Sequence, residues 1–579
     1  YIAAGLRVGG PYKIIVDSDT YADQEYSDIY LQLGKEERIN SQLQQEDTNT
    51  IVITGSRVLS TMADGSSSYF GEQAIKTQSG ITRDIKDIVR ANPLVVVLPG
   101  DDAQLTIAGM NPRFNSFTVD GISQNDDFGL NVGGNATQRS PLPIDALEQV
   151  TVDAAPFDAK VSGFSGGLIN AVFKSGTNEL HGGVWFEKLD DQWAGTPKDQ
   201  GVEIPVEFGE ESWGVNLDGA LIKDKLFFNV SYESFDSPQT LEFGAAGSGA
   251  ANVTEATLAE VAEVQRIARD VYGLTDAQTG SDTGSPVEED EKYVIKLDWN
   301  INDFHRAAFT YQFNEGNRTR NTTSSPGELR LSSHWYNVTE ELNNYTAKVY
   351  SDWTNDFSSE ISVTSKEVSN RQVSFGNFAD VTVRNLPSGG NIAFGSDFSR
   401  HANTLDTATD ILKFDGVYLL TDHSIEFGFE YQELSVQNLF VQNSKGTIVF
   451  DNLANFENLI GDYTYANGTG NDPFAVGADF NRETFSFYVQ DHWIVSDQLD
   501  LTFGLRYETL KSDDKPPFNQ NSMNRTGFDN SENLDGIDIF LPRLGIKYEV
   551  NDDLTLRGGI GRFSGGQPNV WISNAYSAN

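Results

Sequence analysis

Histidine is the side chain most often used for metal binding and for acid–base chemistry, and this sequence contains six histidines scattered along 579 residues. No two of them have the i, i+4 spacing that places a zinc-binding pair on one helix face. Cysteine is absent, which excludes thiolate metal ligands and disulfides. We therefore expect neither a resident metal nor a cofactor. The histidines are His181, His305, His334, His401, His423 and His492.

Carboxylates are the other candidate metal ligands. The cluster Glu288-Glu289-Asp290-Glu291 lacks the regular spacing of a calcium-binding loop. A solvated loop is therefore favoured, with weak divalent binding as the alternative. No nucleophile, base and orienting group can be assembled from the spacing of residues along the chain, so the sequence does not predict an enzyme.

Glycines gather at Gly163, Gly166, Gly167 and Gly176. Glycine-rich loops can cradle phosphate, but neither Gly-Lys-Ser/Thr nor Gly-x-Gly-x-x-Gly occurs here. Tight packing of the backbone is the better interpretation.

A different kind of chemistry belongs to Thr50-Ile51-Val52-Ile53-Thr54. This short β-prone run has no proline and follows a polar, non-periodic linker at residues 35–49. Such a tethered strand can add to the edge of a partner's sheet through its main-chain hydrogen bonds. The alternative is an ordinary first strand of the domain that follows.

Composition narrows the class of protein. The hydrophobic content is 38%, and no stretch approaches the roughly 20 apolar residues of a membrane helix. The net charge of −43 opposes binding to nucleic acid phosphates. The acidity is interpreted first as a means of solubility in a salty medium. The alternative is a cation-rich outer face or a basic cargo.

From about residue 179 the hydrophobic pattern has a period of two. Leu501, Phe503 and Leu505 enclose Thr502 and Gly504, and the same alternation occurs in strand after strand. A soluble sandwich also alternates, but here short and long connections alternate strictly, as in outer-membrane barrels. Short connections are expected near 222–225, 300–303, 354–356, 421–423, 495–498 and 550–553, and long ones near 188–210, 236–290, 314–340, 367–402, 435–481 and 511–537.

Roughly 13 barrel strands follow from this rhythm. Bacterial single-chain barrels have an even number of strands, so the chain is expected to be incomplete at both ends. The last strand is expected to lead into another loop at Gly561–Gly566. The connection 236–290 is expected to carry a helix that begins with a Thr257/Glu260 capping box and ends at Gly273. That helix either packs on its own loop or serves as a lid or partner contact.

The order of the pieces resembles a TonB-dependent outer-membrane transporter. Thr50–Thr54 resembles the energy-coupling TonB box, and Leu105–Gly109, Phe117–Gly121 and Ile169–Asn178 resemble segments of the plug. The stretch from Pro156 to Asn178 is most similar to the Oar-like branch. The resemblance implies a mostly β fold, in which a plug occludes a transmembrane antiparallel β-barrel of 22 strands.

The resemblance also implies domain bounds and roles. Residues 1–34 would be the tail of a carboxypeptidase-regulatory-like β-sandwich, residues 35–54 a linker with the TonB box, residues 55–177 the plug and residues 178–579 a partial barrel. Ala108 stands where many members have the arginine of a plug–barrel latch. Glu148 matches the plug glutamate of the family and is expected to pair with a barrel arginine such as Arg506 or Arg557. The plug motif residues are Ile107, Gly109, Asp120, Gly121, Glu148, Gly166, Gly167, Asn170 and Gly176.

The implied function is TonB-dependent uptake of an unidentified, large ligand across the bacterial outer membrane. The expected partners are TonB with its inner-membrane energising complex, outer-membrane lipid and lipopolysaccharide, and an extracellular ligand, but not nucleic acid. The alternative is a barrel for adhesion, or for assembly or secretion, without active uptake. An extracellular β-rich enzyme is disfavoured by the missing active site and by the loop asymmetry.

Overall fold

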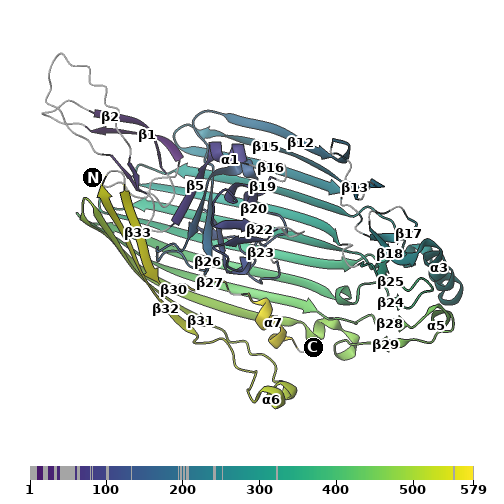
Figure 1. The fold of residues 1–579 in the computed structure, drawn as a ribbon. Helices are drawn as coiled ribbons and strands as arrows, with labels where there is room; N and C mark the ends of the chain where they lie inside the picture. Colours follow the sequence, from purple (N-terminus) through teal and green to yellow (C-terminus); the bar gives the residue numbers. More distant parts are fainter. Residues whose placement is uncertain are drawn as a thin grey trace, which may run out of the picture.

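A computed structural model shows a large curved antiparallel sheet with a smaller domain inside it (Figure 1). The structure describes residues 9–16, 24–31, 36–39, 59–61 and 66–577. Gaps within the last stretch fall at 79, 81–82, 99–103, 132, 194, 196–197, 200–201, 204–207, 239–240, 242, 249, 251, 321–323, 552–553 and 567. No helix in these described ranges is long and apolar enough to cross a membrane.

The barrel sheet contains 13 strands, each antiparallel to its sequence neighbour. This confirms the strand count and the alternation of short turns with long loops. The strands are β12 (His181–Asp190), β15 (Gly209–Ile222), β16 (Leu226–Pro238), β19 (Val287–Asn300), β20 (His305–Arg320), β22 (Tyr336–Asp352), β23 (Phe357–Ser374), β26 (Asn403–Leu419), β27 (His423–Phe440), β30 (Ala478–Ser496), β31 (Leu499–Lys511), β32 (Asp538–Asn551) and β33 (Leu554–Gly561).

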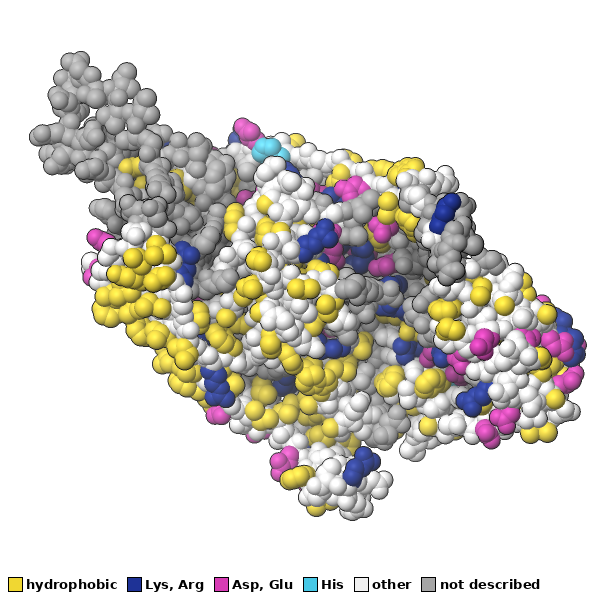
Figure 2. All heavy atoms as spheres, viewed as in Figure 1, with side chains coloured by type: hydrophobic (Ala, Val, Ile, Leu, Met, Phe, Trp, Pro, Cys, Tyr) yellow, Lys and Arg dark blue, Asp and Glu magenta, His cyan; other side chains and the backbone are white. Residues whose placement is uncertain are grey.

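Alternation along each strand separates a lipid face from an inner face. On β31, Phe503 is 44% exposed whereas its neighbour Thr502 is 5% exposed and faces inward. Trp299, Trp353 and Trp493 are exposed near the short-turn ends of the strands, where an interfacial aromatic belt belongs. Hydrophobic side chains gather over the barrel strands at the left of Figure 2.

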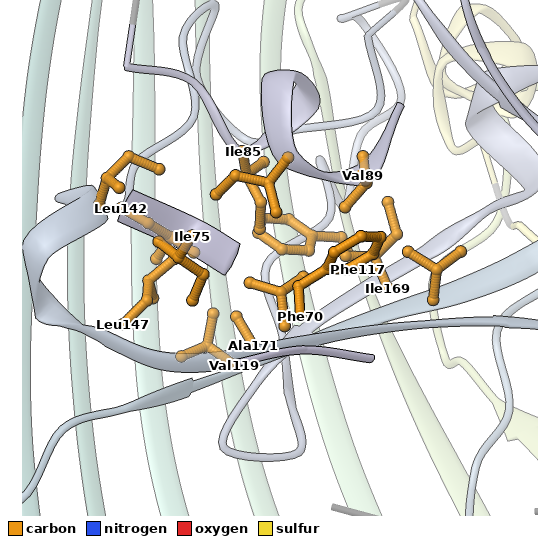
Figure 3. Close-up of a cluster of buried hydrophobic side chains, with 14 of the residues drawn as sticks. Phe70, Ile75, Ile85, Val89, Phe117, Val119, Leu142, Leu147, Ile169 and Ala171 are labelled. Atoms are coloured by element: carbon orange, nitrogen blue, oxygen red, sulfur yellow. The ribbon is translucent and has the colours of Figure 1, made fainter. Parts of the chain in front are cut away.

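The plug is a five-stranded sheet in the order β5-β10-β11-β8-β9, covered by two short helices. Its hydrophobic core includes Ile75, Leu142 and Leu147, all of which are buried (Figure 3). The elements are β5 (Ser66–Gly71), α1 (Glu72–Gln78), α2 (Ile85–Val89), β8 (Ser116–Val119), β9 (Ile122–Ser123), β10 (Leu147–Ala154) and β11 (Gly167–Phe173).

Helix α2 begins where the Asp84 side chain accepts a hydrogen bond from the Lys86 amide. Its apolar residues Ile85, Ile88 and Val89 are buried. Smaller strand pairs lie beside the plug or before it: β1 (Gly9–Val16) with β2 (Gln24–Leu31), β3 (Glu36–Arg38) with β4 (Leu59–Thr61), and β6 (Val95–Val97) with β7 (Leu105–Ile107).

Four long loops join into one folded outer domain. A sheet in the order β21-β25-β24-β28-β29 is assembled from three of them, and its core continues into a helical fourth loop. The elements are β17 (Phe243–Ala246), β18 (Asn252–Thr257), α3 (Leu258–Tyr272), α4 (Asp276–Thr279), β21 (Glu328–Arg330), β24 (Asp380–Val383), β25 (Asn391–Gly395), β28 (Thr447–Phe450), α5 (Leu453–Glu457) and β29 (Asp462–Thr464). The remaining loop elements are β13 (Lys198–Asp199), β14 (Val202–Glu203) and α6 (Gln520–Thr526).

The expected capping box of α3 is present, with Gly273 in the left-handed conformation at the end of the helix. The helix packs beyond its own loop, because Tyr272 stacks on Phe456 of α5 at 4.9 Å. Acidic and basic side chains gather over this end of the molecule, at the right of Figure 2.

The loop that follows β33 begins as expected but turns into the barrel. Residues 562–577, which we call the inner segment, carry helix α7 (Val570–Tyr576). The helix contacts β30 on the inner face of the sheet.

Candidate functional site: the plug held inside the barrel

The interface between the plug and the barrel wall is the candidate functional site. The candidate TonB box, Thr50–Thr54, lies outside the described residues. The plug motif residues are described, and they fall mainly at turns and at close contacts of the plug backbone.

Two plug turns use the left-handed backbone conformation. Ala108 and Gly109 have φ values of +52° and +76°, and Asp120 and Gly121 have φ values of +48° and +78°. Glycine adopts this conformation without steric strain. Asp120 is also bonded to the wall, because Lys296 Nζ lies 3.3 Å from its carboxylate.

The glycines after β10 allow close approach of the backbone. A Cβ at Gly166 would lie 2.2 Å from Asn115 Oδ1, and one at Gly176 would lie 2.4 Å from the Gly219 carbonyl oxygen. A Cβ at Gly167 would lie 2.6 Å from Ile107. These contacts support the packing interpretation over a phosphate loop. Asn170, on the neighbouring strand β11, accepts a hydrogen bond from the Thr118 hydroxyl at 2.7 Å.

Glu148 does not form the expected pair with Arg506. Arg506 is bonded instead to Glu508 at 2.6 Å and lies 3.9 Å from Glu430. A glutamate two residues along the same strand reaches the guanidinium more readily than a plug residue does. Burial raises the pKa of Glu148, and the Glu72 carboxylate raises it further.

Glu72 is the better-paired carboxylate of the plug. Lys76 and Lys174 lie 2.8 and 3.0 Å from it. Burial alone would raise the pKa of Glu72, but hydrogen bonds from these two lysines and their charges lower it to about 2. The pair with Lys174 joins helix α1 to the segment that leaves the plug.

Buried lysines on the barrel strands donate to main-chain carbonyl oxygens of the plug. Each of these lysines lies on the inner face of a strand, and each donates to the carbonyl oxygen of a different plug residue. The bonds run from Lys292 to Ser140 at 3.0 Å, from Lys296 to Phe173 at 3.0 Å, from Lys348 to Asp120 at 2.6 Å and from Lys366 to Asn125 at 3.1 Å.

Barrel arginines fasten the plug segment 158–161 in the same way. Arg506 donates to the carbonyl oxygens of Ala159 and Lys160, and Arg543 donates to those of Asp158 and Val161. Lys160 itself lies 3.2 Å from the Asp415 carboxylate on β26. Burial would lower the pKa of Lys160, but Asp415 and its neighbouring carboxylates raise it.

Arg83 fastens the N-terminal part of the plug. Its guanidinium lies 2.6 Å from Asp145 of the plug, and 3.3 and 3.5 Å from Glu187 on β12 and Glu233 on β16. It also lies 3.7 Å above the Trp185 ring. We call this cluster the Arg83 clasp. It joins the plug to two strands of the barrel.

Among the described residues, no group of three His, Asp or Glu side chains could hold a metal ion. The charged groups bind backbone oxygens and each other. Because a buried pair is costly to break by removing one partner, these contacts stabilise the plug in its position inside the barrel.

The sequence pattern indicated that lysines face the inside of the barrel. Lys296 and Asp298 stand between apolar residues of an alternating strand, which places charges on the inner face. Nothing in the sequence indicated that their partners would be plug carbonyl oxygens. Nothing in the sequence indicated that Arg83 would contact the barrel.

A plug domain inside an antiparallel outer-membrane barrel defines a class, the TonB-dependent receptors. The chain belongs to this family: residues 259–579 match the family described as outer membrane beta barrel domain, and residues 60–168 match the TonB-dependent receptor plug domain. The protein is therefore located in the bacterial outer membrane.

Two relatives in sequence are described as TonB-dependent, one as a transporter and one as a receptor. The chain is 26% identical over 349 residues to the TonB-dependent transporter Oar of Myxococcus xanthus, a match that covers 56% of this chain and 30% of Oar. It is 31% identical over 163 residues to the probable TonB-dependent siderophore receptor PirA of Acinetobacter baumannii, covering 26% of this chain and 20% of that protein. The chain thus matches less than a third of either relative.

Solved structures agree with the fold. The outer membrane transporter YddB of Escherichia coli superposes with a TM-score of 0.61 at 13% identity, covering 87% of this chain and 62% of YddB. PirA of Acinetobacter baumannii gives a TM-score of 0.57 at 16% identity, covering 88% of this chain and 62% of that chain.

Proposed function

We propose that this protein carries out TonB-dependent active uptake of a ligand across the outer membrane. The observation that carries the proposal is the way the plug is held. Its apolar core is built from plug residues with Val294 of β19 as the single barrel residue in the cluster, whereas many of its contacts with the wall are hydrogen bonds and ion pairs. A separate domain held by polar contacts can be remodelled inside the barrel while the barrel itself stays folded.

Thr50–Thr54 is the proposed coupling segment. It precedes β5, which is the edge strand of the plug sheet and pairs with β10 alone in that sheet. Force applied to this segment would therefore reach the plug at an edge strand. In this proposal TonB grips Thr50–Thr54 by strand addition, and the proton gradient supplies the work.

The test is a proline substitution in the coupling segment. Proline removes an N–H donor and fixes φ, so Ile51→Pro or Val52→Pro should abolish uptake and binding of the purified periplasmic domain of TonB. Folding and ligand binding should be unchanged. Ile53→Val is the matched control and should be nearly silent. The probes are labelled components of the growth medium that the purified protein retains. Uptake is measured as their accumulation in cells, and this accumulation should depend on the proton gradient.

Normal uptake by the proline variants would mean that TonB does not act through this segment. The second candidate function, a barrel for adhesion or for assembly, would then be preferred. The folded outer domain favours that candidate, because its core of side chains from four loops makes a rigid surface for a large partner.

A further inference from the structure

The inner segment is bonded to the plug as if it were part of it. The Val570 amide donates to the Phe128 carbonyl oxygen at 2.7 Å, and Asn569 Nδ2 donates to the Asp127 carbonyl oxygen at 2.5 Å. Both acceptors lie in the plug loop 126–130. Any movement of helix α7 therefore pulls on this plug loop.

The other side of α7 fills a site on the barrel wall, which we call the α7 site. Tyr576 stacks on Phe480 of β30 with ring centroids 4.4 Å apart and planes at 18°. Asn438 of β27 donates to the Ser573 hydroxyl at 3.0 Å. The apolar lining of the site consists of Phe128, Leu405, Leu434, Val436 and Ala478.

The α7 site contains a buried cation that makes no direct ion pair among the described residues. Arg482 of β30 is 7% exposed. Its Nη1 donates to the Asn569 amide oxygen at 3.1 Å, its Nε has no hydrogen-bond partner, and it forms no ion pair within the described residues. The nearby Asp127 carboxylate is bound to Lys366 at 2.7 Å. A buried guanidinium is stabilised best by a carboxylate that accepts two of its N–H groups, and a neutral amide oxygen is a weak substitute.

We infer that the α7 site is a ligand subsite for an aromatic group that bears a carboxylate. The aromatic ring would take the place of Tyr576 on Phe480. The carboxylate would take the place of Asn569 and accept from Arg482. The inference rests on the proposed function, and it names the class of ligand that the barrel receives: a free aromatic acid, or a peptide that ends in an aromatic residue.

In this arrangement α7 is a resident competitor of the ligand. The site becomes available only when α7 withdraws, so the apparent affinity is reduced by the fraction of time that α7 is in place. Withdrawal also breaks the bonds from Asn569 and Val570 to the plug loop. Ligand binding at this site would therefore loosen the plug at 126–130.

The test uses the full chain in detergent and isothermal titration with matched probes. N-acetyl-L-phenylalanine carries a carboxylate, and N-acetyl-L-phenylalanine amide has the same shape without the charge. The acid should bind and the amide should bind about a hundredfold more weakly, in line with the loss of a buried charge-assisted hydrogen bond. The peptide Ala-Ala-Ala-Phe separates the two sources, because a peptide cargo predicts tighter binding of the peptide than of the small acid.

Three substitutions at two positions test the assigned residues. Arg482→Gln should abolish the preference for the acid, and Arg482→Lys should keep part of it, which shows that the site is folded. Tyr576→Ala should tighten binding of the acid by about tenfold, because it removes the stacking that holds α7 in place.

Equal binding of acid and amide, binding of neither probe, or weaker binding by the Tyr576→Ala variant would overturn the inference. These outcomes are independent of the coupling test. If Val52→Pro abolishes uptake but the acid does not bind, transport stands and the subsite fails. If the acid binds as expected but Val52→Pro leaves uptake intact, the subsite stands and TonB coupling fails.

Discussion

Arg83 shows how one side chain can hold two domains together. It is 7% exposed and has a positive φ of 48°, between helices α1 and α2. Its partners come from the plug and from two barrel strands. A charge this deeply buried is stabilised only while its carboxylates surround it, so the clasp favours one position of the plug.

Substitution of Arg83 should therefore loosen the N-terminal part of the plug. Arg83→Gln removes the cation and leaves Asp145 and Glu187 without their partner, at an expected cost of about 3–5 kcal/mol. Hydrogen exchange of the amides in α1 and α2 should accelerate accordingly. Arg90→Gln is the matched control, because the Arg90 side chain is 60% exposed and its pair with Asp87 is worth at most about 1 kcal/mol. Equal effects of the two substitutions would contradict the clasp.

Glu148 should destabilise the plug at neutral pH. Burial and then repulsion by Glu72 raise its pKa, so folding favours the protonated form. The stability that this group contributes is present below its unfolded pKa and is lost as the pH rises through the higher folded pKa. Glu148→Gln should therefore raise the plug melting temperature at pH 7 and leave it unchanged near pH 3. A melting temperature lowered at pH 7 would reveal a cationic partner for Glu148.

For single residues, the sequence indicated where a side chain lies better than it indicated which residue that side chain contacts. The turn glycines and the alternating lysines could be assigned from local pattern, because backbone conformation and strand face are local properties. The Glu148–Arg506 pair was wrong because Glu508, two residues from Arg506 on the same strand, takes the guanidinium. Arg83 and Glu233 lie 150 residues apart, and no local pattern relates them.

Among the elements, the barrel strands were the most predictable. Each strand has two faces with different solvents, so a period of two is imposed along its whole length. Lys296 and Thr502 face the inner side as the pattern requires. The strands of the five-stranded sheet in the outer domain are three to five residues long and drawn from three loops. Runs that short carry no readable period, and the outer domain was not predicted.

The strand faces give a paired test. Phe503→Arg places a cation on the lipid face and should cost roughly 2–4 kcal/mol near the bilayer midplane. Thr502→Arg places the same side chain on the polar inner face and should cost less. Assembly into outer membranes, followed by heat-modifiable electrophoretic mobility, should therefore be impaired more by Phe503→Arg. Equal impairment would count against the register of β31.

For the whole molecule, the alternation of short and long connections fixes the orientation. All six short connections between barrel strands lie at one end of the sheet, and the long loops, including the outer domain, lie at the other (Figure 1). The sequence predicted this asymmetry from loop length. It did not predict that the inner segment turns back into the barrel, because a loop that folds inward differs from one that folds outward only in its long-range partners.

The orientation can be tested with single cysteines, since the chain has none of its own. Phe528 is 77% exposed in the long connection between β31 and β32, and Asp422 is exposed in the short turn between β26 and β27. An outer-membrane barrel presents its long loops to the medium and its short turns to the periplasm. Phe528→Cys should therefore react with a membrane-impermeant maleimide on intact cells, whereas Asp422→Cys should react only after the cells are opened. Labelling of Asp422→Cys on intact cells, with Phe528→Cys protected, would invert the topology. The outer domain would then face the periplasm, where it could not receive an external ligand.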